Sequence, residues 1–281
     1  MMDSLVYADG TWHEGDPPLI GALSQSYMHG TAVFDGARLF NDCVPDLGRH
    51  CERLLRSAAV MGLDQPVDAA TVESLAREGA RRFETGAELY IRPSLYAARG
   101  FLTPEPGSTR FLLSLMRMAM PAAHGRSITV SPFRRPGPDM APTEAKASCL
   151  YPNGSRALQD AERRGFDNAL MLDGDGNVAE LASANVWLGR NGVAITPVWN
   201  RTFLNGITKL RVSALLGELG IDVVEQTVSL DDVMGADEVF STGNWGKVLP
   251  ITRVDDHEFA VGPLYRAARE AYWAYAETEP L

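Results

Sequence analysis

An amine nucleophile can stand at only three positions of this 281-residue chain. Lysine occurs at Lys146, Lys209 and Lys247, and the other 23 of the 26 basic residues are arginine. Arginine serves wherever only positive charge matters, whereas a lysine amine can also act as a nucleophile or a base. Lys209 lies one turn into a predicted helix and Lys247 follows a glycine-containing turn, so we expect both to be solvated. If the chain carries amine chemistry, Lys146 is therefore the first candidate.

The neighbours of Lys146 are unusually small for a lysine. It stands in APTEAKASCLYPNG, just after a proline-rich loop. Burial there would lower the pKa of the amine from ~10.4 toward the ~7–8 that suits a nucleophile or general base. The alternative is a lysine at a strand edge with its charged end in solvent. Tyr151, five residues later, could donate a hydrogen bond to a cofactor oxygen or cover the core.

A carboxylate with apolar neighbours is the second candidate. Glu180 stands in the predicted strand VAELA, where alternation places it on the same side as Val178 and Ala182. An ionised carboxylate in apolar surroundings is costly unless a cation or a donor meets it. Two interpretations stay open: an exposed hairpin face, or a carboxylate that pairs with a protonated ring nitrogen.

Two turns and one arginine have the composition of an anion site. NGIT at 205–208 opens a predicted helix, where Gly206, the free backbone N–H groups and the Thr208 hydroxyl could hold a phosphate or form a plain helix cap. STGN at 241–244 is a similar turn. Arg53, on a predicted helix, could bind a phosphate in a fork geometry. With a reactive amine, a tyrosine and a carboxylate for a ring nitrogen, these are the groups that pyridoxal 5′-phosphate (PLP) requires.

The elements that must position these residues follow from hydrophobic periodicity. Strands and helices are mixed without regular βαβ alternation, which disfavours doubly wound folds and favours two α/β domains, the second rich in antiparallel hairpins. We expect a small domain at 1–120, a link at 121–126 and a larger domain at 127–281. The expected elements are hairpins at 5–14, 168–182 and 184–197, strands at 88–97 and 110–118, and helices at 49–62, 69–84, 153–165, 207–219 and from 263 onward.

Composition excludes several other classes of function. The formal charge of −10 disfavours nucleic acid as a partner. Three cysteines without a CxxC pair and five histidines without an HxxxH spacing give no support for a metal site. The first residues lack the features of a signal peptide, and the most apolar stretch, 111–120, is too short to span a membrane. We expect a cytoplasmic protein with no membrane partner.

Seven segments occur in an order that resembles the class IV (fold type IV) aminotransferases. They are HGTAVFDGAR, HCERLLRSA, YIRP, PTEAKASCLY, ELASANVW, NGITKLRV and DEVFSTGN, and the similarity runs from about residue 5 to 275. The resemblance implies PLP as cofactor and an α/β (α+β) fold, with a small N-terminal domain and a larger pseudo-barrel domain. It also implies a homodimer whose active site lies at the subunit interface.

The resemblance also assigns roles at the cofactor. Lys146 would form the Schiff base and then move a proton between the substrate Cα and the cofactor C4′. Glu180 would face the pyridine nitrogen, and Tyr151 the phenolic oxygen. Asn244 stands where the family commonly has threonine, and its amide can still donate. The positions that would hold the phosphate or lie in the turns around it are Arg53, Gly206, Ile207, Thr208, Thr242, Gly243 and Asn244.

Within the family, the branched-chain type is the nearest match, acting on an apolar L-amino acid with 2-oxoglutarate. Phe34 offers apolar contact and Gly36 leaves room, whereas Tyr90 and Arg92 could hold a carboxylate. Two further substrate positions depart from that type: His29 stands where tyrosine is common, and Trp245 where a small residue is usual. The segment after YIRP differs as well.

Three other activities stay open on the same fold. One is an (R)-selective amine or D-amino-acid transaminase, although the Arg-x-His carboxylate trap of the D-amino-acid enzymes is not evident in RGFLTPE. Another is an aminodeoxychorismate lyase-like elimination, which the same lysine can serve. A non-catalytic PLP-binding protein is the last, and the presence of Lys146 with Glu180 argues against it, because storing a ligand needs no electron sink.

Overall fold

The computed structural model describes residues 2–281, which form two compact units. The first unit holds the chain up to residue 120 with 144–150 and 276–281, and the second holds 121–143 and 151–275. We expected the two short segments in the second domain. They join the first unit through backbone hydrogen bonds, because Phe34 N–H donates to the Lys146 carbonyl and Val44 N–H to the Glu279 carbonyl.

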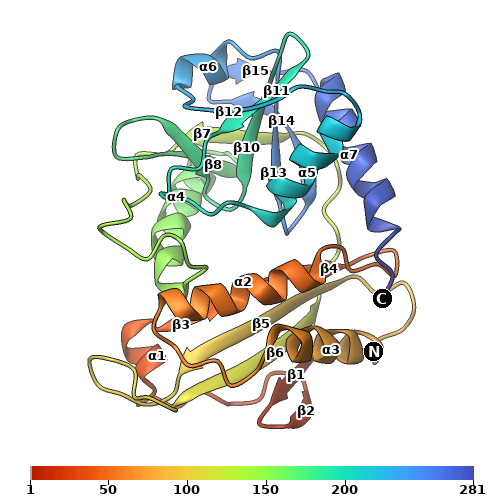
Figure 1. The fold of residues 1–281 in the computed structure, drawn as a ribbon. Helices are drawn as coiled ribbons and strands as arrows, with labels where there is room; N and C mark the ends of the chain where they lie inside the picture. The colour runs from red at the N-terminus through yellow and green to blue at the C-terminus, as the bar shows by residue number, and fades with distance from the viewer. Residues whose placement is uncertain (1) are drawn as a thin grey trace. The chain divides into compact units, whose positions relative to one another are not determined.

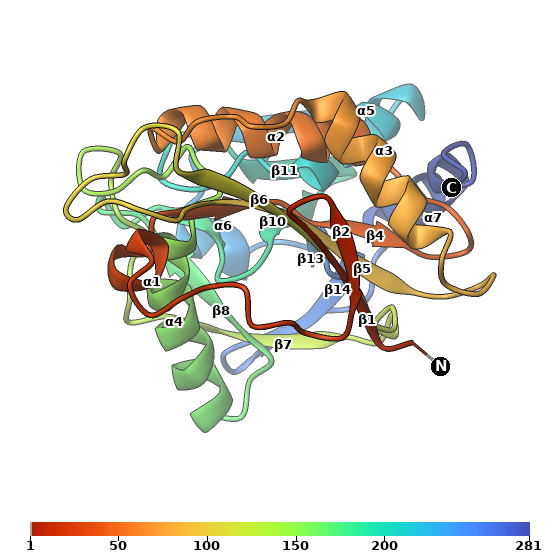
Figure 2. The same cartoon turned by 90° about the horizontal axis from the view of Figure 1, so that it is seen from below.

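The first unit is built on a six-stranded antiparallel sheet in the order β2-β1-β6-β5-β3, with β4 also paired to β5 (Figures 1 and 2). The predicted hairpin at 5–14 and the two long strands are confirmed. The strand bounds are Ser4–Ala8 (β1), Thr11–Glu14 (β2), Ala32–Phe34 (β3), Ala37–Leu39 (β4), Leu89–Ala97 (β5) and Thr109–Arg117 (β6).

Two helices cover one face of this sheet (Figure 2). They are α2 (Leu47–Val60) and α3 (Ala69–Ala80), and both were predicted. The short helix α1 (Gln25–His29) was not predicted. Gly79 of α3 lies against Leu115 of β6, which pairs with Ile91 of β5. Because side chains alternate along a strand, the half-buried Tyr90 and Arg92 face away from these helices.

The second unit is a nine-stranded mixed sheet in the order β12-β11-β10-β13-β14-β7-β8-β9, with β15 paired to β14. β7 runs parallel to both β8 and β14, and β11 parallel to β12. The strand bounds are Arg126–Val130 (β7), Asn168–Leu172 (β8), Val178–Leu181 (β9), Asn185–Arg190 (β10), Val193–Pro197 (β11), Val223–Gln226 (β12), Glu238–Gly243 (β13), Lys247–Val254 (β14) and His257–Glu258 (β15).

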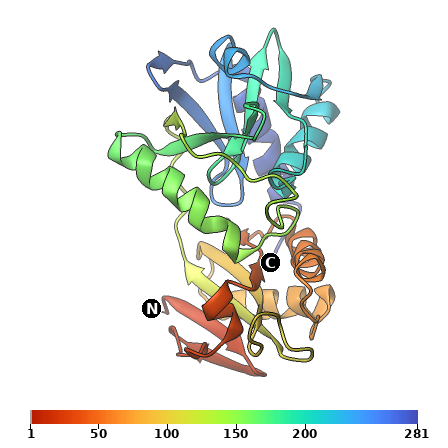
Figure 3. The same cartoon turned by 90° about the vertical axis from the view of Figure 1, so that its left-hand side faces the viewer.

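This second sheet curls so that its last strand returns to β10. Leu181 N–H donates to the Ala184 carbonyl just before β10 begins, and the enclosed core consists of aliphatic side chains such as Ile128, Leu170 and Val239. Outside the strands, α4 (green in Figure 3) packs alanines against β8. The helices of this unit are α4 (Tyr151–Arg163), α5 (Ile207–Glu218), α6 (Leu230–Met234) and α7 (Pro263–Ala276), preceded in the first unit by the 3₁₀ turn η1 (Ser148–Leu150).

The strand β14 was not predicted, because Lys247, Pro250 and Arg253 interrupt its hydrophobic alternation. No helix within residues 2–281 has the length and apolar character needed to cross a membrane. In the same part of the chain, no three His, Cys, Asp or Glu side chains are grouped so that they could hold a metal ion.

Candidate active site

Lys146 lies on a short segment that continues the sheet of the first unit. Its N–H donates to Ser57 Oγ at 3.0 Å, its carbonyl accepts from Phe34 N–H at 3.1 Å, and Ala147 bridges to Val33. The side chain is half-buried, and Nζ lies 5.1 Å from the centroid of the Phe34 ring. Both flanks of the lysine backbone are therefore fixed, and the amine stands over an aromatic face.

Three predicted substrate residues meet in this unit. Phe34 pairs with Ser94 across β3 and β5, so it shares a face with Tyr90 and Arg92, which lie at alternate positions of β5. The Arg92 guanidinium lies over the Phe34 ring, with Cζ 3.7 Å from its centroid. The arrangement combines an apolar surface with a cation and a phenol, which suits ligands with an aliphatic part and a carboxylate.

Arg53 occupies a buried charged cluster on α2. Its Nε lies 2.6 Å from Asp35 Oδ2 and its Nη2 2.9 Å from Asp35 Oδ1, while His50 Nδ1 lies 2.6 Å from the same Oδ1. Gly36 N–H also donates to this carboxylate at 2.7 Å. Burial alone would raise the pKa of Asp35, but Arg53 and His50 hold it well below its usual range. Asp35 is therefore ionised, and His50 Nδ1 carries the proton that it shares.

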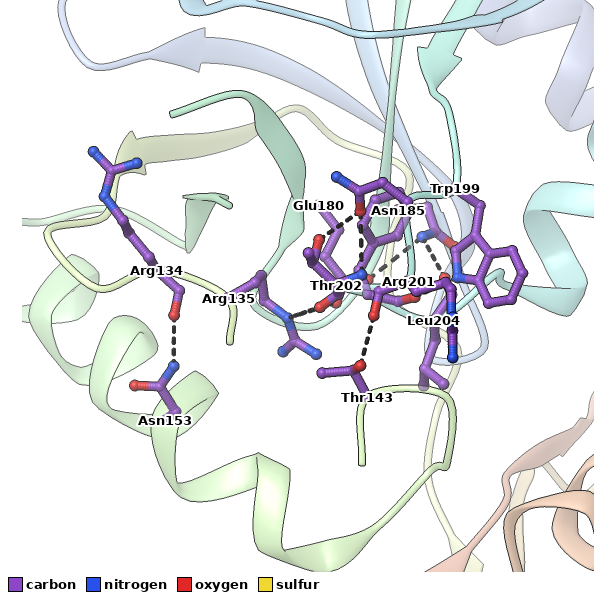
Figure 4. A network of polar contacts seen from close by, with 12 residues as sticks. Arg134, Arg135, Thr143, Asn153, Glu180, Asn185, Trp199, Arg201, Thr202 and Leu204 are labelled. Atoms are coloured by element: carbon purple, nitrogen blue, oxygen red, sulfur yellow. Dashed lines mark hydrogen bonds and ion pairs between the residues drawn. The ribbon is translucent and has the colours of Figure 1, made fainter. Parts of the chain in front are cut away.

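Glu180 is buried in the second unit at 8% exposure and is flanked by donors (Figure 4). Arg135 Nε lies 3.4 Å from Oε1, and Asn185 Nδ2 lies 3.4 Å from Oε2. The interpretation of an exposed hairpin face is therefore wrong. A buried ionised carboxylate needs such partners.

The expected face of Glu180 needs one correction. The pairing of β8 with β9 shifts register, so Leu172 faces Val178 and Met171 faces Glu180. Cross-strand partners share a face of a sheet, and Val178 belongs to the interior core with Leu172. The irregularity at Ala179 therefore turns Glu180 away from Val178 and out of the apolar core.

Asn185 connects Glu180 to the start of α5 (Figure 4). Its Nδ2 also donates to the Leu204 carbonyl at 3.1 Å. A Cβ on Gly206, the N-cap of α5, would overlap Asn185 Oδ1, so glycine is required for this close approach. No side chain within residues 2–281 caps the helix, which leaves the first-turn N–H groups of Ile207 and Thr208 suited to an anion.

The loop before α5 is held by side chains on both sides (Figure 4). Arg135 Nε donates to the Thr202 carbonyl at 3.2 Å and Thr143 Oγ1 to the Arg201 carbonyl at 2.5 Å. Within the loop, Trp199 Nε1 donates to the Phe203 carbonyl at 2.7 Å. These bonds fix the path of the chain into Gly206 and hence the direction of the helix start.

The turn after β13 approaches the same end of the sheet. Thr242 pairs with Asn185 across β10 and β13, and its Oγ1 accepts from Trp187 Nε1 at 2.9 Å. Asn244 Oδ1 accepts from Lys247 Nζ at 2.8 Å. Asn244 Nδ2 is buried and has no hydrogen-bond partner among residues 2–281. Gly243, between Thr242 and Asn244, lies against Ala184, where a Cβ would be tight.

The expectation that Lys209 and Lys247 are solvated is wrong. Lys209 is 0% exposed, and its Nζ lies 3.1 Å from Glu225 Oε2. Burial lowers the pKa of Lys209, although Glu225 opposes the shift. Lys247 is 1% exposed against Asn244 and the Tyr272 ring. Burial therefore does not set Lys146 apart from the other two lysines.

The remaining predicted residues are more exposed. Tyr151 begins α4 with 39% of its surface exposed, and His29 is the exposed last residue of α1. Trp245 is 45% exposed beneath Arg126, whose Cζ lies 5.0 Å from its ring, and both line a cavity of about 130 Å³ in the second unit. Ser241 and Gly243 line this cavity and Thr242 between them does not, so it lies on the opposite face of β13 from the Thr242 hydroxyl.

Comparison with known proteins identifies the family. The profile of a family described as amino-transferase class IV matches residues 32–254. A probable branched-chain-amino-acid aminotransferase of Aquifex aeolicus is 31% identical over 269 residues, covering 90% of this chain and 86% of that protein. The chain belongs to the class IV aminotransferase family.

Solved structures agree with that membership. The crystal structure of an aminotransferase from Brucella abortus bound to PLP is 45% identical, with a TM-score of 0.96 over 98% of this chain and 99% of that one. A branched-chain aminotransferase from Thermoproteus uzoniensis with norvaline is 30% identical, with a TM-score of 0.91 over 98% and 95%. This class IV aminotransferase therefore has fold type IV and is a PLP-dependent enzyme.

Each unit of this aminotransferase holds residues that fit the cofactor. The first presents the Lys146 amine beside Phe34. The second presents the buried Glu180 carboxylate, the start of α5 without a side-chain cap, and the Asn244 amide, whose Nδ2 is buried. These groups match an aldehyde, a ring nitrogen and a phosphate respectively.

Sequence reasoning missed the residues that support the predicted ones. Asp35 and His50 pair with Arg53, and Arg135 and Asn185 pair with Glu180. Arg38 is fully buried beside Tyr90 in the first unit and donates to the Met118 carbonyl. Asp35, His50 and Asn185 stand inside the motifs that carry the family resemblance, and this position was the signal that could have found them. Arg135 follows another arginine in the proline-rich loop, where no motif pointed to it.

Proposed function

We propose that this aminotransferase moves the amino group of an apolar, branched-chain L-amino acid to 2-oxoglutarate. The donor leaves as its 2-oxo acid and the acceptor as L-glutamate, so the two half-reactions balance. The observation that carries the proposal is the contact between Arg92 and Phe34, with Cζ 3.7 Å from the ring. It joins a surface for an aliphatic side chain to a cation for the second carboxylate of 2-oxoglutarate.

The substrate class is also supported by the relatives. The Aquifex aeolicus protein is named a probable branched-chain-amino-acid aminotransferase, and the Thermoproteus uzoniensis enzyme was crystallised with norvaline, an unbranched aliphatic amino acid. Gly36, two residues after Phe34, is buried and has no side chain. The room it leaves suits a branched donor.

Lys146 is proposed to hold the cofactor and to move the reacting proton. Its backbone is fixed on both sides by Ser57 and Phe34, so the side chain alone needs to move between positions. Bound PLP supplies an electron-accepting ring that stabilises the negative charge left at the substrate Cα. The Lys146 amine would take the proton from the substrate Cα and deliver it to the cofactor C4′, the carbon on the other side of the transferred nitrogen.

Glu180 is proposed to hold a proton at the ring nitrogen. Arg135 Nε lies 3.4 Å from Oε1 and Asn185 Nδ2 lies 3.4 Å from Oε2, so each oxygen has a donor that holds the carboxylate in place. A negative charge held in a buried position favours the protonated form of a facing nitrogen.

The phosphate is proposed to bind to hydrogen-bond donors and to an arginine. In the second unit, the first-turn N–H groups of α5, the Thr208 hydroxyl and the Asn244 amide would donate to it. In the first unit, Arg53 is proposed as a further phosphate ligand. Tyr151 would donate to the phenolic oxygen. His29 and Trp245 would border the substrate.

A panel of amino donors tests the substrate assignment. With 2-oxoglutarate as acceptor, L-leucine should react far faster than D-alanine or (R)-1-phenylethylamine, measured as glutamate formed. Asp16→Asn, which removes an exposed charge from the same unit as Phe34 and Arg92, serves as the control and should leave the order unchanged. Preference for D-alanine or the (R)-amine would overturn the L-branched-chain assignment.

One observation favours the (R)-amine or D-amino-acid alternative. Trp245 places an indole, 45% exposed, at a position where the branched-chain type has a small residue. An aromatic side chain there would suit an aryl substrate or a narrower opening. Trp245→Ala should leave L-leucine turnover within about threefold if the branched-chain assignment holds, since the substitution removes only apolar contact area.

We also propose a homodimer located in the cytoplasm. Several large apolar side chains on and near α1 are exposed, and Ser24 at its start donates to the Ala97 carbonyl beside the loop that carries Phe101 and Leu102. Exposed apolar groups of this kind mark contact surfaces. Light scattering after size exclusion should give twice 30.6 kDa, and a monomer would contradict the proposal. The exposed apolar residues are Ile20, Leu23, Tyr27, Met28, Phe101 and Leu102.

A further inference from the structure

The turn after β13 holds a lysine and an asparagine in direct contact. Lys247 is 1% exposed, and its Nζ lies 2.8 Å from Asn244 Oδ1 and 5.8 Å from the centroid of the Tyr272 ring. Its φ of +59° is in the left-handed region that favours glycine. Neither solvation nor backbone preference accounts for a lysine at this position.

The contact determines which way the Asn244 amide points. An ammonium group has only donors, so the amide atom that faces it must be the oxygen. Nδ2 is therefore directed away from Lys247. It is buried and has no hydrogen-bond partner among residues 2–281. A buried amide without an acceptor is costly, and an acceptor supplied by a ligand removes that cost.

The surroundings select an anionic acceptor. Thr242, two residues before Asn244, lies opposite Asn185 in the sheet, and Asn185 abuts Gly206 at the start of α5. The amide therefore belongs to the end of the sheet at which the uncapped helix begins. Backbone N–H groups at a helix start and a fixed amide donor together suit a phosphate.

We propose that Lys247 is a positioning residue for cofactor binding: it holds Asn244 Oδ1 so that Nδ2 donates to the phosphate of PLP. The inference rests on the proposed function and deepens it. A threonine hydroxyl, common in the family at position 244, can turn its own proton toward a phosphate. An asparagine presents either hydrogens or an oxygen, and the oxygen would repel the anion. Lys247 selects the orientation in which Nδ2 faces the phosphate.

A double-mutant cycle on the full-length protein tests this role. Lys247→Met, Asn244→Thr and the double variant are resolved from cofactor and titrated with PLP and with pyridoxal, which lacks the phosphate. Lys247→Met should weaken PLP binding about tenfold, the loss expected for one donor to a charged group, and leave pyridoxal binding unchanged. In the Asn244→Thr background, Lys247→Met should change neither affinity.

Arg190→Met is the control. It removes another cation of the same unit, whose Nη1 contacts Asp232 rather than a predicted phosphate donor. It should leave the ratio of PLP to pyridoxal affinity unchanged, and thermal unfolding of each apoprotein reports the folded state.

A second variant keeps the test decisive if Lys247→Met does not fold. Asn244→Asp retains a partner for Lys247 but directs a carboxylate oxygen at the phosphate, so PLP binding should fall more than tenfold relative to the wild type while pyridoxal binding persists. Equal losses for PLP and pyridoxal, or the same loss in the Asn244→Thr background, would overturn the positioning role. Normal PLP binding combined with failure of the donor panel would instead overturn the proposed substrate.

Discussion

The two units treat their buried carboxylates differently. The Asp35 carboxylate in the first unit forms short hydrogen bonds of 2.6–2.9 Å with Arg53, His50 and the Gly36 N–H. Glu180 in the second unit has contacts of 3.4 Å to Arg135 and Asn185. Shorter charge-assisted bonds are stronger. The Asp35 cluster is therefore expected to contribute more to the stability of its own unit, whereas the Glu180 carboxylate is proposed to face the cofactor.

The largest effect expected from this comparison is on the stability of the first unit. Asp35→Asn leaves the Arg53 and His50 side chains buried without their shared carboxylate, and should lower the free energy of unfolding by about 3 kcal/mol. Urea unfolding measures the loss. Asp16→Asn removes an exposed carboxylate in the same unit and should change stability by less than about 0.5 kcal/mol. Equal losses of unfolding free energy in the two variants would show that the Asp35 cluster stabilises the unit no more than an exposed carboxylate does.

The pH dependence has a defined sign. The pKa of Asp35 is lowered in the folded state below an unfolded value of ~3.9, so its contribution is present above about pH 4 and is lost as pH falls toward the folded pKa. Between about pH 4 and pH 2 the stability of the wild type should therefore fall more steeply than that of Asp35→Asn. Parallel curves would contradict the assigned role.

The next effect concerns catalysis in the second unit. Glu180→Gln keeps the shape of the side chain but removes its charge, and should lower kcat about 100-fold, as for loss of one preorganised electrostatic partner. The visible absorption of the bound cofactor should shift as well, since the ring nitrogen loses its anionic partner. Glu162→Gln removes an exposed carboxylate from α4 in the same unit, and both readouts should match the wild type.

The smallest expected effect tests the close approach at the start of α5. Gly206→Ala would place a Cβ against Asn185 Oδ1 and push the helix start aside, which should weaken PLP binding about tenfold through the displaced N–H donors. Gly217→Ala, in the same helix with open space around it, should bind PLP normally and be slightly more stable. Equal PLP affinities in the two variants would contradict the proposal that the N–H groups at the start of α5 bind the phosphate.

The sequence predicts local elements well because their periodicity is local. The hairpins, α2, α3, α5 and the long strands β5 and β6 all lie within a few residues of their expected bounds. β14 has no such signal, since Lys247 and Pro250 break its alternation.

What the sequence could not predict depends on partners far along the chain. The burial of Lys209 depends on Glu225, and that of Glu180 on Arg135, which lies in the loop after β7. The register shift in β9 reverses the face expected for Val178 relative to Glu180. Such pairings and irregularities are set by tertiary packing, which overrides simple alternation.

The family resemblance located residues that periodicity could not rank. Lys146 is half-buried, whereas Lys209 and Lys247 are fully buried, so neither scarcity nor burial singles it out among the three lysines. Its choice rests on the motif PTEAKASCLY and on the contact with Phe34.

Reduction with borohydride followed by peptide mapping tests the central claim most directly. The account predicts a single stable PLP adduct, carried by the peptide that contains Lys146 and absent from Lys146→Ala. An adduct on Lys209 or Lys247, or no adduct in protein that holds PLP, would contradict it.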